Sequence, residues 1–98
     1  MEAVVAPSYV YILANKKGGT LYTGSTTDIR RRMEEHRAKV VAGFTKKYSV
    51  TRLVYLEPHA TIAEARYRER AIKRWYRAWK IALIERSNPE WYDLTKRL

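Results

Sequence analysis

The sequence predicts an α+β fold, a small α/β sandwich built from three strands and helices. Three short segments are rich in β-branched and aromatic residues, which favours strands. Two longer segments begin with helix-capping residues and continue with helical apolar spacing. We expect a flexible tail at residues 1–7 and a single domain at residues 8–98, with the order strand, strand, helix, strand and a final helical stretch.

The first two strands are expected to form a hairpin. Residues 9–14 (YVYILA) are apolar on both faces, which is typical of a covered central strand, and LYT from Leu21 is the return strand. Residues 15–19 (NKKGG) predict the turn between them. We expect its two central residues to be either Lys16–Lys17 or Gly18–Gly19.

This hairpin carries two tyrosines, Tyr11 and Tyr22. Because side chains alternate with a period of two along a strand, either turn leaves both tyrosines on the same face of the sheet. Their two hydroxyl groups can then converge on one point. The alternative is that both rings are ordinary packing surface with their hydroxyls at the rim.

The helix expected after the hairpin begins with a run of arginines. Residues 26–28 (Thr, Thr, Asp) offer N-caps, and the helix runs to about Lys39. Arg30, Arg31 and Arg32 stand in its first turns, where each charge opposes the helix dipole by roughly a few tenths of a kcal/mol. A polyanion such as a phosphate backbone would compensate for this cost.

Arg32 differs from its neighbours because Asp28, Arg32 and His36 are four residues apart and share one helix face. A guanidinium held beside two phenols suits a phosphate group, because its planar fork binds two oxygens at once. The alternative is a surface ion pair between Asp28 and Arg32. Gly24, just before this helix, is expected to allow a close approach of chain segments or an unusual φ.

A basic loop and a third strand follow. Residues 40–51 are expected to form the loop, which carries the pair Lys46 and Lys47. The strand begins at Arg52 and is expected to stop at Pro58. The paired lysines are candidates for contact with a phosphate backbone.

The last helical stretch opens with a capping box at residues 61–64 and extends to about Arg86. Neither Gly nor Pro interrupts it, so the sequence leaves open whether it is one helix or two. The segment after it is expected to fold back and bury Trp91 and Leu94.

A carboxylate interrupts the apolar stripe of this stretch. At spacings of three and four residues, the stripe consists of Ile62, Ala65, Glu69, Ile72, Tyr76, Trp79 and Leu83. Because a glutamate is rarely buried without a partner, Glu69 is either in an internal salt bridge, for instance with an arginine, or a metal ligand. Mg²⁺ typically accepts a single carboxylate together with waters.

Basic and aromatic residues are interleaved in KRWYRAWK at residues 73–80 and in KKY at residues 46–48. Such a mixture can stack bases and bind a phosphate backbone. The alternative is a set of core aromatics flanked by charged side chains that reach solvent. We expect at least one of Trp75 and Trp79 to be in the core.

The composition favours nucleic acid as the partner. Lys and Arg number 20 against 10 Asp and Glu, which gives a net charge of +10. No apolar run approaches the roughly 20 residues of a membrane span, and the start lacks the basic region of a signal peptide, so we expect a cytoplasmic protein without membrane contact. The absence of Cys excludes disulfides and thiolate zinc sites, so that any metal would be a hard cation on oxygen ligands.

Several of these motifs, taken in order, resemble the GIY-YIG nuclease domain. YVY at residues 9–11 and YTG at residues 22–24 match its two tripeptides. An arginine follows ten positions after Tyr22, a histidine four positions later, and a helical glutamate downstream. The resemblance runs from about residue 9 to residue 94 and is greatest to the small standalone bacterial UPF0213 group. The chain departs from the family pattern at Tyr9, where Gly is usual, and at Thr23, where Ile or Val is usual.

The resemblance implies a three-stranded antiparallel sheet flanked by helices, which agrees with the expected order of strands and helices. It also implies metal-dependent hydrolysis of phosphodiester bonds, usually in DNA. By position, Glu69 would hold one Mg²⁺ or Mn²⁺, Arg32 would neutralise charge on the phosphoryl oxygens, and Tyr22 rather than Tyr11 would activate water. His36 would help to position water or phosphate. Contacts with nucleic acid are expected from Arg30, Arg31, Lys46, Lys47, Lys73, Arg74 and Asn88.

Two other functions stay open at this point. The chain could be a nucleic-acid-binding module that keeps the fold without catalysis, or a small ribosome-associated protein that binds RNA, although the latter leaves Glu69 unexplained. We expect a monomer that prefers a DNA structure to a DNA sequence, since so short a chain has no room for an added DNA-reading domain. RNA remains a second possible substrate.

Overall fold

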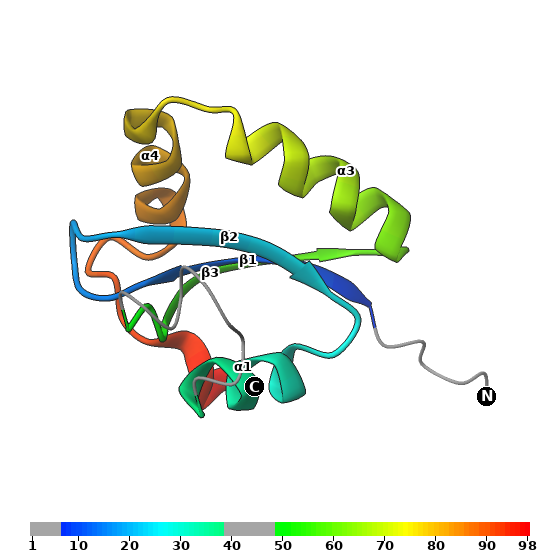
Figure 1. Ribbon diagram of the computed structural model, residues 1–98. Coiled ribbons are helices and arrows are strands. Elements are labelled where there is room, and N and C mark those ends of the chain that lie inside the picture. The colour runs from blue at the N-terminus through cyan, green and yellow to red at the C-terminus, as the bar shows by residue number, and fades with distance from the viewer. Residues whose placement is uncertain (1–6, 39–48) are drawn as a thin grey trace.

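The computed structural model describes residues 7–38 and 49–98 (Figure 1). Within these residues the sheet has three antiparallel strands in the order β2-β1-β3, with β1 at Ser8–Ala14, β2 at Leu21–Thr26 and β3 at Arg52–His59. The predicted fold class is confirmed. The lysine pair at positions 46 and 47 lies outside the described residues.

Helices cover both faces of this sheet (Figure 1). α3 (Ile62–Lys73) and α4 (Arg77–Ser87) lie on one face, whereas α1 (Ile29–Arg37) and the 3₁₀ helix η1 (Leu94–Arg97) lie on the other. β1 is the central strand, and residues 10–14 are buried. Coverage from both sides accounts for the continuous apolar run of this strand. Among the described residues, no helix is both long and apolar enough to cross a membrane.

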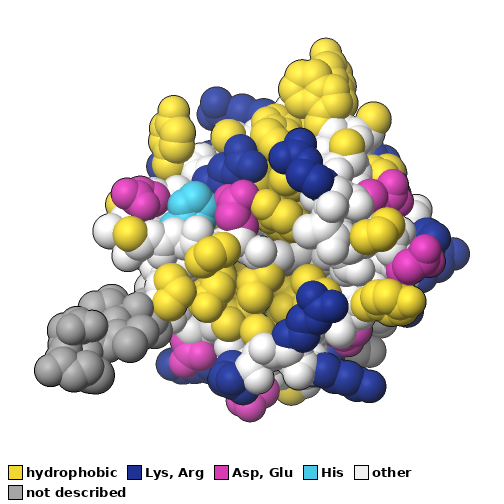
Figure 2. Space-filling view, turned by 180° about the vertical axis from the view of Figure 1, so that it is seen from behind, with side chains coloured by type: hydrophobic (Ala, Val, Ile, Leu, Met, Phe, Trp, Pro, Cys, Tyr) yellow, Lys and Arg dark blue, Asp and Glu magenta, His cyan; other side chains and the backbone are white. Residues whose placement is uncertain are grey.

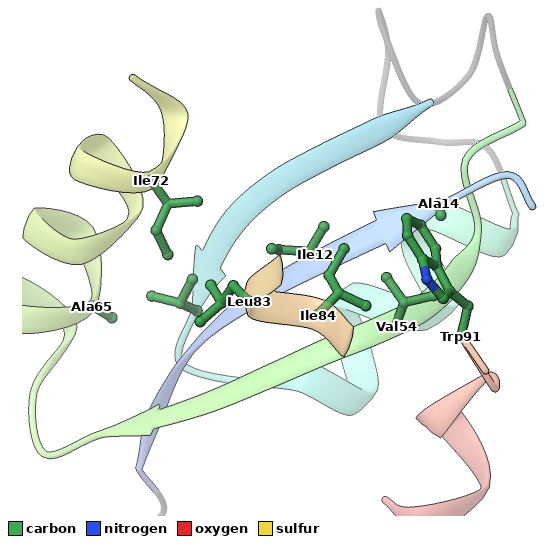
Figure 3. Packing of buried hydrophobic residues seen from close by; sticks show 9 residues of the cluster. Ile12, Ala14, Val54, Ala65, Ile72, Leu83, Ile84 and Trp91 are labelled. Atoms are coloured by element: carbon green, nitrogen blue, oxygen red, sulfur yellow. The ribbon is translucent and has the colours of Figure 1, made fainter. Parts of the chain in front are cut away.

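Each face of the sheet has its own hydrophobic core. On the side of α3 and α4, Ile12 and Val54 of the sheet pack with Ile72, Leu83 and Ile84 of the helices (Figure 3). On the side of α1, the buried residues are Tyr11, Leu13, Ile29, Met33, Val50 and Leu53. Tyr11 is therefore a core residue as well as a candidate site residue.

The hairpin turn lies between the two positions that we expected. The N–H of Gly19 donates to the carbonyl of Lys16 at 3.0 Å, which centres the turn on Lys17 and Gly18. Gly18 has a positive φ of 71°, which its missing side chain permits. Relative to either expected turn, the pairing of β1 with β2 is shifted by two residues. Because this shift is even, each side chain stays on the face of the sheet that we expected.

As a result, the two tyrosines share one face of the sheet, as predicted. Tyr11 pairs with Gly24, and Tyr22 pairs with Leu13. Because Tyr11 and Leu13 are two residues apart on β1, their side chains and that of Tyr22 point to the same side. This side is the one that α1 covers.

The final helical stretch is two helices, with a bend at residues 74–76. A straight helix over residues 62–87 would be about 39 Å long, against roughly 26 Å for a strand of eight residues. Only a bend lets both halves pack on the sheet. It also corrects the predicted stripe, because Tyr76 and Trp79 are 73% and 54% exposed. Trp75 is the partly buried tryptophan that packs against the core.

The predicted helix starts agree with the structure. Asp28 caps α1 and accepts from the backbone N–H of Arg31 at 3.1 Å, and Thr61 caps α3 by accepting from that of Glu64 at 3.1 Å. β3 is longer than expected, because it passes through Pro58 and ends at His59. A proline is tolerated there because β3 is an edge strand.

Asn88 has a structural role at the C-terminus of α4. Its side-chain amide donates to the carbonyls of Val54 at 3.0 Å and Tyr92 at 2.9 Å, and its Oδ1 accepts from the N–H of Tyr92 at 3.0 Å. The residue is only 4% exposed. We therefore correct the expectation that Asn88 contacts nucleic acid, because its amide already holds the end of α4 to β3 and to the C-terminal segment.

The C-terminal segment folds back as predicted. Trp91 is fully buried, and its Nε1 donates to Oε2 of Glu85 at 2.7 Å. Leu94 is partly buried against the core on the side of α1. The chain thus passes from one face of the sheet to the other after α4 (Figure 1).

Gly24 allows a close approach rather than an unusual φ. A Cβ atom at this position would lie 2.5 Å from the hydroxyl oxygen of Tyr11 and 2.6 Å from its Cζ. Real Cβ atoms do not come so close to other atoms, so the Tyr11 ring occupies space that only a glycine leaves free. The contact joins the two strands of the hairpin.

We expect Gly24→Ala to lower the free energy of unfolding by roughly 1–3 kcal/mol, because the added methyl group must displace the buried Tyr11 ring. Urea denaturation measures the loss. Gly18→Asn is the matched control, since no atom lies within 4 Å of an added Cβ there and asparagine tolerates a positive φ. Equal stability of the two variants would contradict the proposed contact.

For Asn88→Ala we expect a loss of roughly 2–3 kcal/mol, because buried backbone groups of Val54 and Tyr92 lose their partners. Thermal unfolding gives the change, and DNA affinity of the folded protein should be unaltered. Asn15→Ala removes an exposed amide that accepts only from the N–H of Thr20, so it should cost far less. A stable Asn88→Ala protein with weakened DNA binding would restore the original interpretation.

Candidate active site

Tyr11 is the centre of a cluster between the sheet and α1. Its ring is fully buried, and its hydroxyl lies 3.1 Å from Nε2 of His36 and 3.4 Å from Nη1 of Arg32. Arg32 and His36 come from successive turns of α1 and project from one face of that helix. The structure thus brings together three side chains that the sequence singled out.

Arg32 is held by neighbours on two sides. Its guanidinium donates to the Tyr11 hydroxyl and pairs with Oε1 of Glu35 at 3.1 Å. Burial lowers the pKa of Arg32, but the hydrogen bond with Tyr11 and the charge of Glu35 outweigh this effect and raise the pKa. The suggested ion pair with Asp28 is replaced by these contacts, because Asp28 caps the helix instead. Arg32 is a permanent cation whose side chain is 34% exposed.

Tyr22 completes a triangle of rings with Tyr11 and His36. The ring centroids of the two tyrosines are 6.3 Å apart, and that of His36 lies 5.8 Å from Tyr11 and 5.5 Å from Tyr22. Tyr22 is the more accessible of the two tyrosines, because Tyr11 is buried and Tyr22 only partly so. A molecule approaching from solvent therefore meets Tyr22 first.

Burial sets the protonation states of Tyr11 and His36. It raises the pKa of Tyr11 to about 12, and burial together with the charge of Arg32 lowers the pKa of His36. At neutral pH, Tyr11 is a neutral phenol and His36 a neutral imidazole. Since Arg32 donates to the phenol oxygen, the phenol proton is available to Nε2 of His36. Tyr11 is a hydrogen-bond donor and an anchor for α1, and a poor base.

The lowered pKa of His36 also links the cluster to stability. The unfolded chain binds the proton more readily than the folded one. The contribution of this group is therefore present above the ordinary histidine value of 6.5 and is lost as the pH falls through the lower folded-state pKa. The cluster is weakened by acid.

Glu69 reaches the edge strand β2 from α3. The hydroxyl of Ser25 donates to Oε1 of Glu69, and Nζ of Lys73 lies 2.7 Å from Oε2. The carboxylate side chain is 17% exposed. The internal salt bridge considered in the sequence thus exists, but its cation is a lysine one turn away on the same helix and not an arginine.

Lys73 connects Glu69 with the aromatic triangle. Its Nζ lies 5.8 Å from the centroid of the Tyr22 ring, within the range of a cation–π contact. The charge of Glu69 also contributes to the raised pKa of Tyr11. Side chains from β1, β2, α1 and α3 therefore meet along one edge of the sheet.

The donor chemistry around Glu69 fits one hard divalent cation. A carboxylate and the Ser25 hydroxyl offer oxygen ligands, and Mg²⁺ commonly takes one or two carboxylates and completes its shell with water and substrate phosphate. Within the described residues, no group of three or more His, Cys, Asp or Glu could form a cage for a metal. An ion at Glu69 would have to displace the Lys73 ammonium from Oε2.

Two hollows adjoin these residues. One, of about 270 Å³, is lined by Leu21, Tyr22, Thr23, Lys73 and Lys80, so both of its charged lining residues are cations. The other, of about 250 Å³, is lined by Thr26, Thr27, Asp28, Arg31, Arg32 and Glu35, so its two cations are balanced by two carboxylates. The first hollow therefore offers the positive charge that favours a phosphate backbone, beside the candidate catalytic residue Tyr22.

The remaining basic candidates are exposed. Arg30 and Arg31 project from α1, where Arg31 also forms an ion pair with Glu35 at 3.4 Å, and Arg74 ends α3. None of these three is needed to hold the fold, so their charges are available to a ligand.

Sequence reasoning missed two residues of this region, Ser25 and Lys80. Ser25 follows Gly24 on an edge strand, and alternation along that strand was the available signal that it points toward α3 and not toward Tyr11. Lys80 lies in the basic and aromatic segment, but its place beside Tyr22 depends on the bend between α3 and α4.

Comparisons with known proteins show similarity over most of the chain. The model of the GIY-YIG catalytic domain matches residues 7–82. A UPF0213 protein of Syntrophus aciditrophicus is 40% identical over 87 residues, covering 88% of this chain and 98% of that protein. A UPF0213 protein of Staphylococcus haemolyticus is 40% identical over 81 residues, covering 83% and 98%.

A solved structure is also similar. The solution NMR structure of a UPF0213 protein from Bacillus halodurans superimposes with a TM-score of 0.55 at 34% identity, covering 91% of this chain and 94% of that one. The matches extend over almost the whole chain and include every residue of the cluster around Tyr11. The chain belongs to the GIY-YIG nuclease family, as a small protein of its UPF0213 group.

Proposed function

We propose that this protein is a metal-dependent endonuclease that hydrolyses phosphodiester bonds of DNA and selects DNA by structure rather than by sequence. One observation carries the proposal. The buried phenol of Tyr11 contacts the guanidinium of Arg32 and the imidazole of His36. Beside them, α3 brings the carboxylate of Glu69 to Ser25 on the edge strand β2. Such a set can bind a phosphate and neutralise the charge that develops on it.

Arg32 is the residue proposed to hold the scissile phosphate. Its charge is permanent, and its position is fixed by Tyr11 and Glu35. A donor that is already in place needs no reorganisation when negative charge builds up on the phosphoryl oxygens, which is the main source of electrostatic catalysis. His36 and Tyr11 would act as positioning residues, because they fix the side of α1 from which Arg32 projects.

Tyr22 is the residue proposed to activate the attacking water. It is more accessible than Tyr11, and Lys73 lies over its ring. Tyr11 is less suited to this role, because burial raises its pKa to about 12.

Glu69, with the Ser25 hydroxyl beside it, would hold Mg²⁺ or Mn²⁺. The ion supplies Lewis-acid polarisation of the phosphate and stabilises the leaving oxygen. Lys73 would then be released from Oε2, and its ammonium would be free to contact the DNA backbone next to Tyr22. The basic residues Arg30, Arg31 and Arg74 would extend this contact along the strand.

A second function is favoured by one observation. Lys73 already neutralises the Glu69 carboxylate, which is an arrangement that needs no metal. A protein that binds nucleic acid without cutting it would keep such a pair. The following experiment separates the two functions.

We expect Glu69→Gln to reduce cleavage at least about 100-fold, because the neutral amide keeps the shape of the side chain but binds a divalent ion poorly. Nicked, branched, single-stranded and duplex DNA are incubated with Mg²⁺, Mn²⁺ or EDTA. DNA binding in EDTA should persist, since one negative charge has been removed.

The matched control is Glu64→Gln, which changes an exposed glutamate on the same helix. It should cut as the natural sequence does. Failure of the natural sequence to cut any of these substrates with either ion, while it still binds them, would favour the non-catalytic module.

The two tyrosines should give different phenotypes. Tyr22→Phe should lower the single-turnover cleavage rate by about 100-fold or more with little loss of stability, because the ring and its packing are kept. Tyr11→Phe should cost roughly 1–3 kcal/mol of stability, because His36 and Arg32 lose a buried partner. Rates are compared with unfolding midpoints for both variants, and an unchanged rate in Tyr22→Phe would exclude its role as the base.

A further inference from the structure

The bend between α3 and α4 exposes a group of aromatic rings that the proposed catalysis does not use. We call Trp75, Tyr76 and Trp79 the aromatic corner. Tyr76 is 73% exposed and Trp79 54% exposed, whereas Trp75 is partly buried. Figure 2 shows hydrophobic side chains projecting at the top of the molecule, where α3 meets α4, with Lys and Arg side chains beside them. Large exposed apolar groups of this kind often mark a binding surface.

The rings of the aromatic corner brace one another. The ring centroids of Tyr76 and Trp79 are 5.1 Å apart at an interplanar angle of 86°, and those of Trp75 and Trp79 are 6.2 Å apart at 73°. The guanidinium of Arg68 lies 5.1 Å from the Trp75 centroid. These contacts fix the rings while most of Tyr76 and more than half of Trp79 stay accessible, so that binding there orders little that is not already ordered.

A hollow beside these rings has the dimensions and the chemistry for a flat ligand that carries negative charge. It has a volume of about 290 Å³ and is lined by Arg68, Trp75, Trp79, Ala82, Leu83 and Arg86. Two indole rings provide aromatic surface. Arg86 provides positive charge, whereas the guanidinium of Arg68 is already paired with the Glu57 carboxylate, with Nε 3.0 Å from Oε1. A nucleobase has a π-face, and the phosphates next to it are negative, so both parts find partners here.

The aromatic corner is connected to the candidate active site by two lysines. Lys73, two residues before Trp75, contacts Glu69 and lies over Tyr22. Lys80, the residue after Trp79, lines the same hollow as Tyr22 and Lys73, and its Nζ lies 3.5 Å from the carbonyl of Lys73. A nucleic-acid strand that leaves Tyr22 can therefore follow positive charge to the exposed rings.

We infer that the aromatic corner binds unpaired bases of a nucleic-acid strand whose backbone passes the candidate active site along Lys73 and Lys80. In a duplex, each base is already stacked between its neighbours, so its faces are not free for protein rings. If the protein is the proposed endonuclease, this contact selects the substrate, and the inference rests on the proposed function for that role. The preferred substrate then contains an unpaired segment next to the bond that is cut. The binding itself does not depend on catalysis.

The test measures binding in EDTA, so that cleavage does not enter the result. Fluorescence anisotropy gives the affinity of the whole chain for a labelled oligothymidylate and for a duplex of equal length. The natural sequence should bind the unpaired strand, and the variant Tyr76→Ala/Trp79→Ala should bind it about tenfold or more weakly. Its affinity for the duplex should change by less than about twofold, because charge contacts remain.

Matched variants separate stacking from loss of structure. Tyr67→Ala removes a tyrosine of α3 that is 74% exposed and lies outside the aromatic corner. This variant should leave both affinities unchanged. Trp79→Phe keeps a ring and should retain most of the affinity for the unpaired strand. Tryptophan emission should be quenched by oligothymidylate in the natural sequence and less in Trp79→Phe, because Trp91 is fully buried and Trp75 is partly buried.

Three results would overturn the inference. They are failure of the natural sequence to bind oligothymidylate, equal loss of both affinities in the double variant, and retention of both affinities in the double variant. A change in the sedimentation coefficient of the double variant without a change in strand affinity would assign the rings to self-association instead. If binding depends on the rings but no substrate is cut, the inference stands and the proposed endonuclease fails; if DNA is cut and binding ignores the rings, the opposite holds.

Discussion

The close contact between the Tyr11 ring and Gly24 is the constraint on which the rest of the site depends. The contact joins two paired strands of the hairpin, and no helix residue takes part in it. It fixes where the Tyr11 hydroxyl emerges, and that hydroxyl is the shared partner of Arg32 and His36. Because both partners belong to α1, one ring sets the position of the helix as well as the position of the cation.

This constraint explains why an unfavourable helix start is tolerated. Three arginines stand near the N-terminus of α1, where the dipole disfavours positive charge. The N-cap Asp28 and the ion pairs of Arg31 and Arg32 with Glu35 offset part of the cost. The rest would be removed by a phosphate bound to Arg32, as in the proposed function.

The sequence predicts the features that depend on periodicity and fails at those that depend on chain length and on long-range contacts. The shared face of Tyr11 and Tyr22 follows from the period of two and survives a turn placed one residue away from either expected position. The bend at residues 74–76 could not be read from the sequence, because no Gly or Pro marks it and the cause is the size of the sheet.

Asn88 was misplaced for a related reason: its partners are in β3 and in the segment after α4, which only the fold brings together. Lys73 was recognised as basic, but its contact with Tyr22 links a helix and a strand far apart in the sequence.

The bend between α3 and α4 ties the shape of the fold to the distribution of charge and aromatic surface. A straight helix would have kept Tyr76 and Trp79 on the stripe that also contains Glu69, and it would have carried Lys80 away from the sheet. The bend instead returns α4 toward β2, so that Lys80 lies beside Tyr22 while the two rings turn to solvent. The same geometric requirement, that two helices fit on a short sheet, therefore places a second cation at the candidate site and leaves aromatic surface next to it.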